Sequence, residues 1–555
     1  MIKKIVSKNI RLIIFLGLLT FVSLFLRFYQ LGKIPNGLTV DEADMGYNAY
    51  SILHTQKDVY GRKLPLFFQS LDDYKPGFAI YSTIPAIYIF GLSDFSIRFS
   101  PALLGSLTPI LVFFLVRLLY EKKSKYLPAV AAILTAASPW NLAISRATLM
   151  YIDLIFFLLL AFVFFLLALK KNKLFLPISA LFFSITLYVY YAAIIYLPFI
   201  LMLLASIYSK QLLKVKKICF LSLVTLTIFS LPAVIHYLDP VSRSRLNSIS
   251  VFTPDISLPV SISELQDDLN SGNSLFRFFH NRRFVFSINV LDNYADYYNL
   301  DYLFTNSHNV RYFYVNYIGL FYLIEFPLFL IGVVKLVTRR QSSDLFILGL
   351  LILGPLPASL TLGSPFPHRG ILLLLSIELI CAVGFFEAVN GSKFKYRNQL
   401  SFVLVATYLL NVIFFLHQYF VHSPKEFTTE DDNGAWFSTV RDVIPQVNQE
   451  KVKYDKVIFT WSKGKLVPPV YFLFYNKIDP GILQAKASSW KDEPPSYRQL
   501  YSQLGNIEFR PINWQFDKNS KNTLFVGYPG DFSSGINKYA SLPFKENHFI
   551  FVKTN

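Results

Sequence analysis

The sequence predicts a polytopic α-helical membrane protein that ends in an α/β domain outside the membrane. Of its 555 residues, 53% are hydrophobic and only 16% are charged, which is unlike an ordinary soluble domain. Apolar runs long enough to cross a bilayer recur as far as residue 419 and then stop. Basic residues gather in short loops between these runs, as they do in the cytoplasmic loops of membrane proteins.

About eleven apolar segments approach the roughly 20 residues that a spanning helix needs. They are 12–30, 96–119, 127–144, 149–169, 174–190, 191–208, 218–238, 311–334, 345–362, 370–390 and 399–419. With the N-terminus in the cytoplasm, every cytoplasmic loop becomes basic: "EKKSKY", "KKNK", "SKQLLKVKK", "TRRQSSD" and "GSKFKYRN". The run Gly77–Gly91 has only about 15 residues and is predicted to be interfacial or re-entrant.

This topology divides the chain into two predicted domains. Residues 1–420 form the membrane domain, with outer loops at 31–95 and 239–310, and residues 421–555 form an extracytoplasmic domain. In that tail, "KVIFTW", "NTLFVGYP" and "HFIFVKTN" have the pattern of strands, and "PPVYFLFYNK" has the pattern of a helix. The location is therefore the cell membrane, with many passes.

Charge and cysteine content exclude other classes of protein. The net charge of +18 comes mostly from the basic loops, so it does not indicate nucleic-acid binding. The two cysteines, Cys219 and Cys381, both lie in apolar runs, so neither a disulfide framework nor a cysteine metal site is expected. The N-terminal run is too long for a signal peptide and lacks a small-residue cleavage site, so we expect a retained span.

The first outer loop carries adjacent acids in "GLTVDEADMGY". Asp41 or Glu42 at the membrane face can take a proton from a hydroxyl group. The simpler alternative is a helix start, in which Thr39 or Asp41 caps the helix and the dipole favours the acids. Both interpretations stay open from the residues alone.

Basic residues on the predicted outer side form a second set of candidates. Lys75, in "DDYKPGF", is placed to hold a lipid-borne phosphate, although a snorkelling anchor explains it equally well. Arg98 and Arg146 lie at outer ends of spans, where the positive-inside rule gives no reason for them. His368 and Arg369, in "GSPFPHRG", form either an anion clamp or a loop cap.

Asp153 follows Arg146 by seven residues, so on a helix the two side chains share one face. An acid inside a span is costly unless it faces protein or water, and this favours a functional role. Together, the predicted outer charges describe a cavity with acids for a hydroxyl group and cations for a phosphate.

These motifs resemble those of the GT-C membrane glycosyltransferases, in particular the bacterial relatives of the protein O-mannosyltransferases and the lipid A aminoarabinose transferases. The resemblance rests on "DEADMGYNAYSIL", "YGRKLPLFFQSLDDYKPGFAIY", "FSIRFSPALLG", "SRATLMYID" and "PHRG", and the tail run "KVIFTWSKGKLVPPVYFLFYNKIDP" extends it. It implies a GT-C fold and an inverting transferase that moves a sugar from a polyprenyl-phosphate carrier to a hydroxyl acceptor on the outer face. The acceptor is a protein, a lipid or a cell-wall glycan.

The resemblance also implies roles for individual residues. Asp41 matches the catalytic acid, with Glu42 or Asp153 orienting the acceptor. The donor phosphate is bound by cationic side chains: Lys75, Arg98, Arg146, His368 and Arg369. Asp44 stands where the aminoarabinose enzymes have an arginine, so it is expected to matter little. Lys75→Ala is expected to weaken donor use more than folding, because the lysine charge pairs with the ligand and not with a buried protein group.

The implied partners are the lipid-linked donor, the acceptor and membrane lipids. No nucleotide cofactor and no metal ligands are implied, although the site is compatible with a divalent metal. A carrier that moves lipid-linked saccharides across the membrane is the alternative function; it would need mid-span charges and two similar halves, and neither is visible. A membrane-anchored binding protein would not need the acids of the first loop.

The topology predicts that loop 239–310 and the tail lie outside the cytoplasm. Single cysteines at Ser271 and Ser533 should therefore react with an impermeant thiol reagent in intact cells. Labelling of both positions only after lysis would reverse the assignment of sides.

Overall fold

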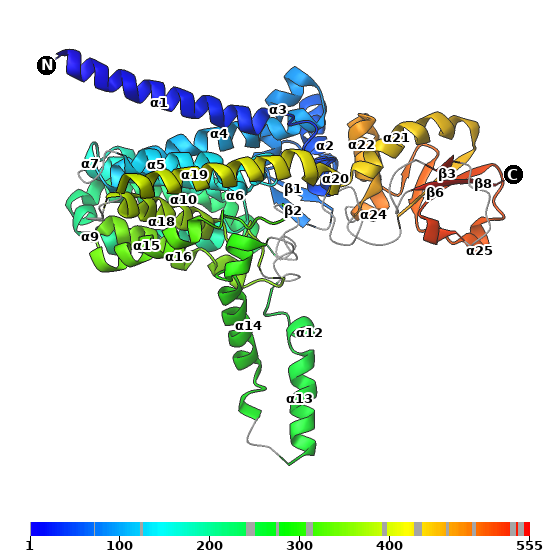
Figure 1. Cartoon of the computed structure of the whole chain (residues 1–555). Helices are drawn as coiled ribbons and strands as arrows, with labels where there is room; N and C mark the ends of the chain where they lie inside the picture. The colour runs from blue at the N-terminus through cyan, green and yellow to red at the C-terminus, as the bar shows by residue number, and fades with distance from the viewer. Residues whose placement is uncertain are drawn as a thin grey trace. The chain divides into compact units, whose positions relative to one another are not determined.

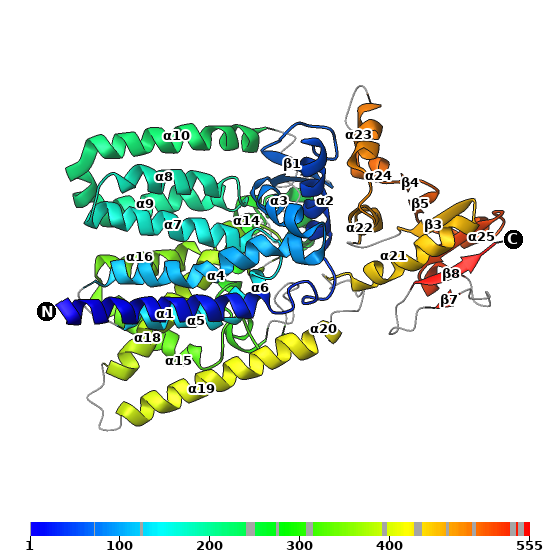
Figure 2. The same cartoon turned by 90° about the horizontal axis from the view of Figure 1, so that it is seen from above.

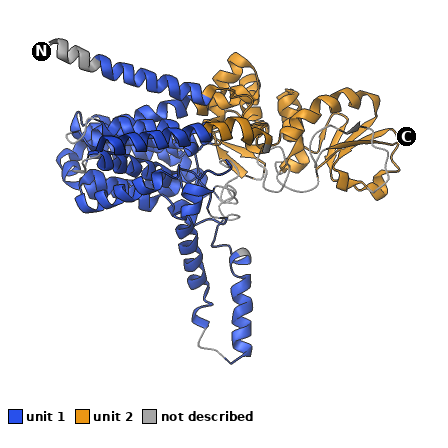
Figure 3. Ribbon diagram, viewed as in Figure 1, with its two compact units in different colours: residues 1–27, 103–145, 150–415 blue, residues 28–102, 146–149, 416–555 orange. Residues whose placement is uncertain are grey.

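The computed structural model covers the whole chain and describes residues 2–71, 73–121, 126–239, 250–272, 277–306, 315–363, 365–390, 397–426, 436–461, 466–490, 495–532, 540–541 and 549–554. The chain divides into two compact units (Figure 3). Unit 1 comprises Met1–Arg27, Leu103–Ser145 and Met150–Phe415, and unit 2 comprises Phe28–Ala102, Arg146–Leu149 and Leu416–Asn555. Ser533, named above, lies outside the described residues.

Long apolar helices make this a multi-pass membrane protein. Among the described residues, 7 helical segments are long and apolar enough to span a membrane: Ile10–Phe28, Asp94–Leu119, Tyr151–Lys170, Ala193–Leu238, Ser342–Ser359, Ile371–Asn390 and Arg397–Lys425. They contain α1 (Ile2–Phe28), α4 (Asp94–Leu119), α7 (Tyr151–Lys170), α9 (Ala193–Leu212), α10 (Lys216–Leu238), α16 (Ser342–Leu353), α17 (Leu356–Ser359), α18 (Ile371–Asn390) and α19 (Arg397–His417). The segment Ala193–Leu238 includes two of the predicted spans, and the total of eleven stays a prediction.

Shorter helices replace some predicted spans. They are α5 (Leu127–Ala137), α6 (Pro139–Ile144), α8 (Phe175–Thr186) and α15 (Glu325–Arg339). The run Gly77–Gly91, predicted to be interfacial or re-entrant, contains the short helix α3 (Phe78–Phe90). The predicted helix 127–144 is wrong as a continuous element, because Ser138 precedes Pro139 and adopts extended backbone. In the predicted span 311–334, the described residues before Glu325 are also not helical. The helix begins only at Glu325, whose carboxylate accepts a hydrogen bond from the Tyr322 amide at 2.8 Å.

The core of unit 1 is the bundle around α18. Every residue of α18 from Ile371 to Gly384 is buried. The helix packs against α15, α16 and α5, and Figure 2 shows α7, α8, α9 and α10 running side by side with them. Gly332 of α15 and Gly384 of α18 face the backbone of the opposite helix, where a Cβ atom would clash. Small residues therefore bring these two helices together, as is typical of membrane bundles.

A helical arm follows α10 in unit 1. It consists of α12 (Pro254–Ser257), α13 (Pro259–Asn270) and α14 (Arg282–Asp296), and η3 (Asp301–Thr305) follows it. Figure 1 shows that α13 and α14 run across the direction of the bundle helices. Ser271, at the end of α13, is exposed.

Unit 2 begins with the first polar loop. Its elements are α2 (Val40–Thr55), the strands β1 (Phe67–Ser70) and β2 (Asp73–Pro76), and α3. The two strands pair antiparallel, with Phe68 opposite Lys75 and Ser70 opposite Asp73. The hairpin therefore carries Lys75 beside the α2 helix, to which it is joined by side-chain contacts described below.

The C-terminal part of unit 2 contains a sheet with the strand order β4-β5-β3-β6-β8-β7. The strands are β3 (Lys456–Thr460), β4 (Gln503–Leu504), β5 (Ile507–Arg510), β6 (Thr523–Gly527), β7 (Ala540–Ser541) and β8 (Ile550–Lys553). Strand β3 is parallel to β5 and β6, and the other pairs are antiparallel. The predicted strands in "KVIFTW", "NTLFVGYP" and "HFIFVKTN" are confirmed.

Helices accompany this sheet. They are α20 (Ser423–Glu426), α21 (Ser438–Glu450), α22 (Pro468–Tyr475), α23 (Pro480–Ser488), α24 (Tyr497–Leu500) and α25 (Trp514–Asp517). The remaining short helices of the chain are η1 (Leu213–Val215), η4 (Gln418–His422), η5 (Lys451–Lys453) and η6 (Pro529–Asp531). The predicted helix in "PPVYFLFYNK" is α22. The strand residues Ile458, Phe525, Ile550 and Val552 form a buried hydrophobic cluster on the sheet.

Within unit 2, α22 and α23 pack on α2. The hydroxyl of Tyr471 donates to the Leu38 carbonyl at 3.0 Å, and that of Tyr47 donates to the Ile478 carbonyl at 2.9 Å. Gly46 leaves room for the Phe474 ring. The C-terminal segment therefore holds the first loop in place, and the domain boundary near residue 420 stays a prediction.

Candidate active site

The acidic pair lies in the first turn of α2. Thr39 has extended backbone, with φ −73° and ψ 160°, and its hydroxyl accepts a hydrogen bond from the Glu42 amide at 3.0 Å. The Glu42 carboxylate returns a contact by accepting from the Thr39 amide at 3.1 Å. This capping box satisfies two free amides at the helix start. Of the two capping residues that the sequence allowed, Thr39 caps the helix, and Asp41 lies inside it.

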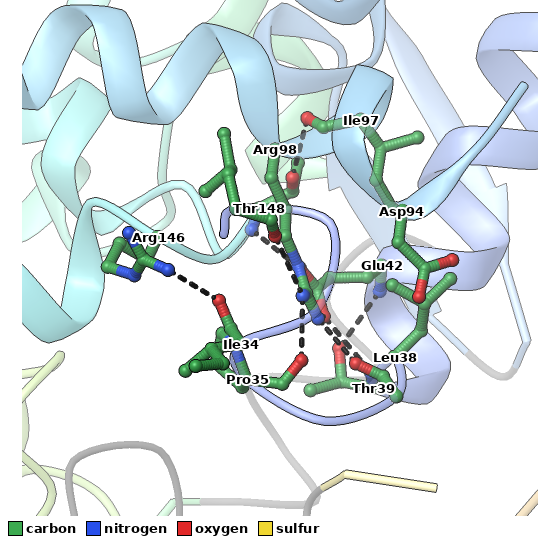
Figure 4. A network of polar contacts seen from close by, with 12 residues as sticks. Ile34, Pro35, Leu38, Thr39, Glu42, Asp94, Ile97, Arg98, Arg146 and Thr148 are labelled. Carbon is green, nitrogen blue, oxygen red and sulfur yellow. Dashed lines mark hydrogen bonds and ion pairs between the residues drawn. The ribbon is translucent and has the colours of Figure 1, made fainter. Parts of the chain in front are cut away.

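Glu42 is completely buried and is held from three sides. Arg98 donates from Nε to Glu42 Oε1 at 2.9 Å and from Nη2 to Oε2 at 3.2 Å. The Thr148 amide also donates to Oε1, at 3.1 Å. Both side chains of the ion pair are 0% exposed. Figure 4 shows this network, in which the carboxylate is surrounded by protein donors.

The remaining donors of Arg98 bind the segment that precedes α2. Nη1 donates to the carbonyls of Pro35 at 2.9 Å and Leu31 at 3.4 Å, and Nη2 donates to Gly37 at 2.5 Å. The guanidinium also lies 5.3 Å from the ring centre of Trp436. Arg98 therefore joins the N-terminus of α4 to the whole turn that leads into α2.

Arg146 performs a similar function from another segment. It is buried, and its Nη2 donates to the carbonyls of Tyr29 at 2.8 Å and Ile34 at 2.9 Å. Its guanidinium lies over the Phe420 ring at 4.9 Å. Figure 4 shows Arg146 pointing at the same turn from the side opposite to Asp94.

Asp41 faces a different environment from its neighbour Glu42. Its side chain is 39% exposed, and its Oδ1 accepts a hydrogen bond from Lys75 Nζ at 2.6 Å. Lys75 itself is 7% exposed and also donates to Ser70 Oγ at 2.7 Å. The β1–β2 hairpin thus places the Lys75 ammonium group against Asp41, which reaches the surface, and not against Glu42, which does not.

Asp44 completes this group of side chains. It is buried, its Oδ2 accepts from Ser70 Oγ at 2.5 Å, and Lys75 Nζ lies 3.9 Å away. Burial raises the pKa of the Asp44 carboxyl, and the Lys75 charge opposes that rise. Burial alone would lower the pKa of Lys75, but Asp41 and Asp44 outweigh it and raise the pKa. The lysine is therefore held in its charged form.

The surroundings of Lys75 and Asp44 bear on two of the expectations from the sequence. The expectation that the Lys75 charge does not pair with a buried protein group is wrong, because the ammonium lies 3.9 Å from the buried Asp44 and also contacts Asp41. Its pairing with a ligand stays a prediction. Asp44 was expected to matter little. Its effect on transfer stays a prediction, but its burial makes it unsuitable as a neutral control position.

Asp153, His368 and Arg369 lie in unit 1. Asp153 is 1% exposed in the first turn of α7, and its Oδ1 has no hydrogen-bond partner among the described residues. The His368 ring stacks on Tyr151, at the same end of α7, with ring centres 4.5 Å apart. Arg369 donates from Nη1 to Thr361 Oγ1 at 2.8 Å and to the Leu362 carbonyl at 2.7 Å.

The structure therefore brings five of the eight predicted residues together in unit 2: Asp41, Glu42, Lys75, Arg98 and Arg146. Sequence reasoning missed Ser70 and Thr148, which connect this group through a hydroxyl and a backbone amide. Neither residue type carries a signal by itself, because serine and threonine are common in loops. In the part of the chain that the structure describes, no three His, Cys, Asp or Glu side chains gather as metal ligands.

Comparisons with known proteins agree with this arrangement. Residues 17–240, which contain all the unit 2 candidates, match the family model described as dolichyl-phosphate-mannose-protein mannosyltransferase. The chain is a membrane glycosyltransferase of the GT-C fold. No curated protein matches this transferase in sequence.

Solved structures resemble the transferase over nearly its whole length. The apo structure of ArnT from Cupriavidus metallidurans has a TM-score of 0.51 at 12% identity and covers 98% of both chains. The structure of the same protein bound to undecaprenyl phosphate has a TM-score of 0.50 at 12% identity, and the match covers 98% of this chain and 97% of that chain. The structure of the Archaeoglobus fulgidus oligosaccharyltransferase with Zn and sulfate has a TM-score of 0.53 at 14% identity, and the match covers 93% of this chain and 68% of that chain. At these identities the similarity establishes the fold, and the predicted GT-C architecture is confirmed.

The buried ion pair predicts a large stability effect. Glu42→Gln and Arg98→Met should each lower the free energy of unfolding by about 3 kcal/mol, because each leaves a buried charge alone. The double variant should cost less than the sum of the two single variants, since no lone charge remains. Thermal unfolding of the detergent-solubilised transferase measures this. Additive effects, or midpoints equal to wild type, would show that the two side chains are not coupled.

Proposed function

We propose that this transferase moves a sugar from a polyprenyl-phosphate-linked donor to a hydroxyl acceptor, with inversion at the anomeric carbon. The donor class is supported by the family model, whose description names a dolichyl-phosphate sugar, and by ArnT, whose structure has been solved with undecaprenyl phosphate. The basic loops favour an outer-face location for this chemistry, and we propose that the N-terminus is in the cytoplasm and the C-terminal domain is outside.

The observation that carries the mechanism is the difference between two adjacent carboxylates. Glu42 is enclosed by Arg98, Thr39 and Thr148 and cannot reach a substrate. Asp41 is 39% exposed. A general base must come within hydrogen-bond reach of the proton that it removes. Asp41 is therefore the base, and Glu42 is a positioning residue that fixes the first turn of α2.

The contact with Lys75 couples the base to the leaving group. The Asp41 carboxylate takes the proton of the acceptor hydroxyl while the acceptor oxygen bonds to the anomeric carbon. The bond from that carbon to the phosphate oxygen breaks, and its electron pair leaves with the lipid phosphate. Protonation of Asp41 removes the negative charge 2.6 Å from Lys75, and the ammonium then stabilises the departing phosphate.

The other cationic residues divide into two groups. Arg98 and Arg146 use several donors on backbone carbonyls of the turn that leads into α2, so we assign them to shaping the site. Asp153, His368 and Arg369 belong to unit 1, where the proposal keeps the roles that the sequence suggested. Asp153 orients the acceptor, and His368 and Arg369 bind the donor phosphate.

The Asp41→Asn variant distinguishes a catalytic role of Asp41 as the base from a purely structural role. The amide keeps the shape of the side chain but cannot accept the acceptor's proton, and Thr39 still caps α2. Transfer should fall by roughly 10²-fold or more, with little change in thermal stability, because a partly exposed ion pair contributes little. The assay follows sugar transfer from purified polyprenyl-phosphate-linked donors in proteoliposomes.

Asp73→Asn is the matched control for Asp41→Asn. Asp73 is a partly exposed acid on β2 of the same loop, and its Oδ1 accepts a hydrogen bond from the Tyr74 amide at 2.7 Å. Its replacement should leave transfer near wild type. Full activity of Asp41→Asn would refute the mechanism, and movement of the intact donor across the bilayer without transfer would favour the carrier function.

The Lys75→Arg variant tests whether Lys75 binds the donor phosphate, while a positive charge remains beside the buried Asp44. The charge remains, but a planar guanidinium replaces the compact ammonium and cannot occupy the same three contacts. The thermal midpoint should stay close to wild type, and kcat/KM for the donor should fall by roughly tenfold or more. Lys63→Arg, at an exposed position of the same loop, serves as the control. An unchanged donor dependence would remove Lys75 from the phosphate site.

A further inference from the structure

The helical arm of unit 1 has an unusual surface. It follows α10 and precedes α15, so it leaves the bundle at the end opposite to the basic ends of α7 and α15, where Lys170 and Arg339 lie. In Figure 1 its helices α13 and α14 run across the bundle, and not along it. Since the bundle helices cross the membrane, a segment that leaves their end in this way extends along the membrane surface.

Large apolar side chains of the arm are exposed. Their exposed fractions are Val260 71%, Ile262 58%, Leu269 46%, Phe278 67%, Phe279 50%, Ile288 48% and Leu291 66%. No residue of α14 is buried. Isolated exposed apolar residues are common, but a concentration of this kind over one supersecondary element marks a binding surface.

The described residues at the far end of the arm combine aromatic and basic groups. Phe278 and Phe279 lie next to Phe284, with ring centres 5.6 and 5.4 Å from it, and yet remain half exposed or more. Arginines 277, 282 and 283 flank these rings and are exposed. We call residues 277–284 the arm tip.

A polar contact fixes the tip to α13. His280 Nε2 lies 3.0 Å from Asp268 Oδ2, and Nδ1 lies 3.1 Å from Ser261 Oγ. The Asn281 side chain also caps α14 by accepting from the Arg283 amide at 2.9 Å. The aromatic and basic groups are therefore presented by a built structure, in which His280 contacts Asp268 and Ser261 of α13 while the three arginines are exposed.

We propose that the arm tip docks on anionic phospholipid headgroups of the leaflet at this end of the bundle, opposite to the end where Lys170 and Arg339 lie. Aromatic rings and long basic side chains occupy the membrane interface together, because the rings enter the boundary of the acyl chains and the charges stay at headgroup level. Each arginine near an anionic surface adds a favourable electrostatic contribution, and the exposed apolar residues add burial. The direction of the arm relative to the bundle brings the tip to that surface.

This inference does not depend on the transfer reaction. It predicts that the arm is anchored to the membrane some distance from the bundle that carries it. A protein partner on the same face is the competing occupant, and it would recognise the rings without regard to lipid charge.

Site-directed spin labelling of the full chain tests the proposal. In a background in which Cys219 and Cys381 are replaced by alanine, a label at Phe279→Cys is compared with a label at Asn519→Cys, an exposed polar position of the C-terminal sheet region. The protein is reconstituted into nanodiscs of phosphatidylglycerol mixed with phosphatidylcholine, and into nanodiscs of phosphatidylcholine alone. Accessibility to oxygen and to a water-soluble nickel chelate reports the depth of each label.

The label at position 279 should be protected from the nickel chelate and accessible to oxygen in the anionic discs, while the label at position 519 stays in water in both. Arg282→Glu with Arg283→Glu should reduce the lipid-bound fraction by on the order of tenfold or more. Chelate access at position 279 in the anionic discs would overturn the docking. Equal protection in both lipids, or no effect of the charge reversals, would overturn the recognition of anionic headgroups.

Discussion

The buried ion pair between Glu42 and Arg98 is the constraint on which the rest of the candidate site depends. A carboxylate and a guanidinium that are both 0% exposed are tolerated only when each finds further hydrogen bonds, and here each does. Glu42 takes the amides of Thr39 and Thr148, and Arg98 takes the carbonyls of Leu31, Pro35 and Gly37. One pair thus joins the turn before α2, the start of α2, the start of α4 and the segment around Thr148.

That constraint separates the functions of two neighbouring acids. Because Glu42 satisfies the capping box and the ion pair, the α2 helix is rotated so that Asp41 faces the β1–β2 hairpin and Lys75. An exposed carboxylate with a charged lysine against it is a suitable acceptor for a proton, whereas an enclosed carboxylate is not. The chemistry proposed for this transferase follows from where one helical turn places consecutive side chains.

The C-terminal sheet region and the arm show two different uses of aromatic residues. In unit 2, the hydroxyls of Tyr47 and Tyr471 reach backbone carbonyls across the contact between α2 and the C-terminal helices, so the rings are buried and specific. In the arm, Phe278 and Phe279 remain exposed beside arginines, which suits the interface between water and lipid. Composition alone counts 55 Phe and 34 Tyr and cannot distinguish these roles.

The sequence by itself determined the membrane class, the apolar helices and the strands of the tail, because hydrophobic length and alternation are local properties of the chain. It also named Asp41, Glu42, Lys75, Arg98 and Arg146 as candidates, since they are charged residues on the predicted outer side of the membrane. It could not show that Glu42 and Arg98 bind each other, that Thr39 caps α2, or that Ser70 bridges Lys75 and Asp44. Those contacts join residues up to 56 positions apart, so only the tertiary structure, which fixes their distances and burial, decided which acid is enclosed and which one reaches the surface.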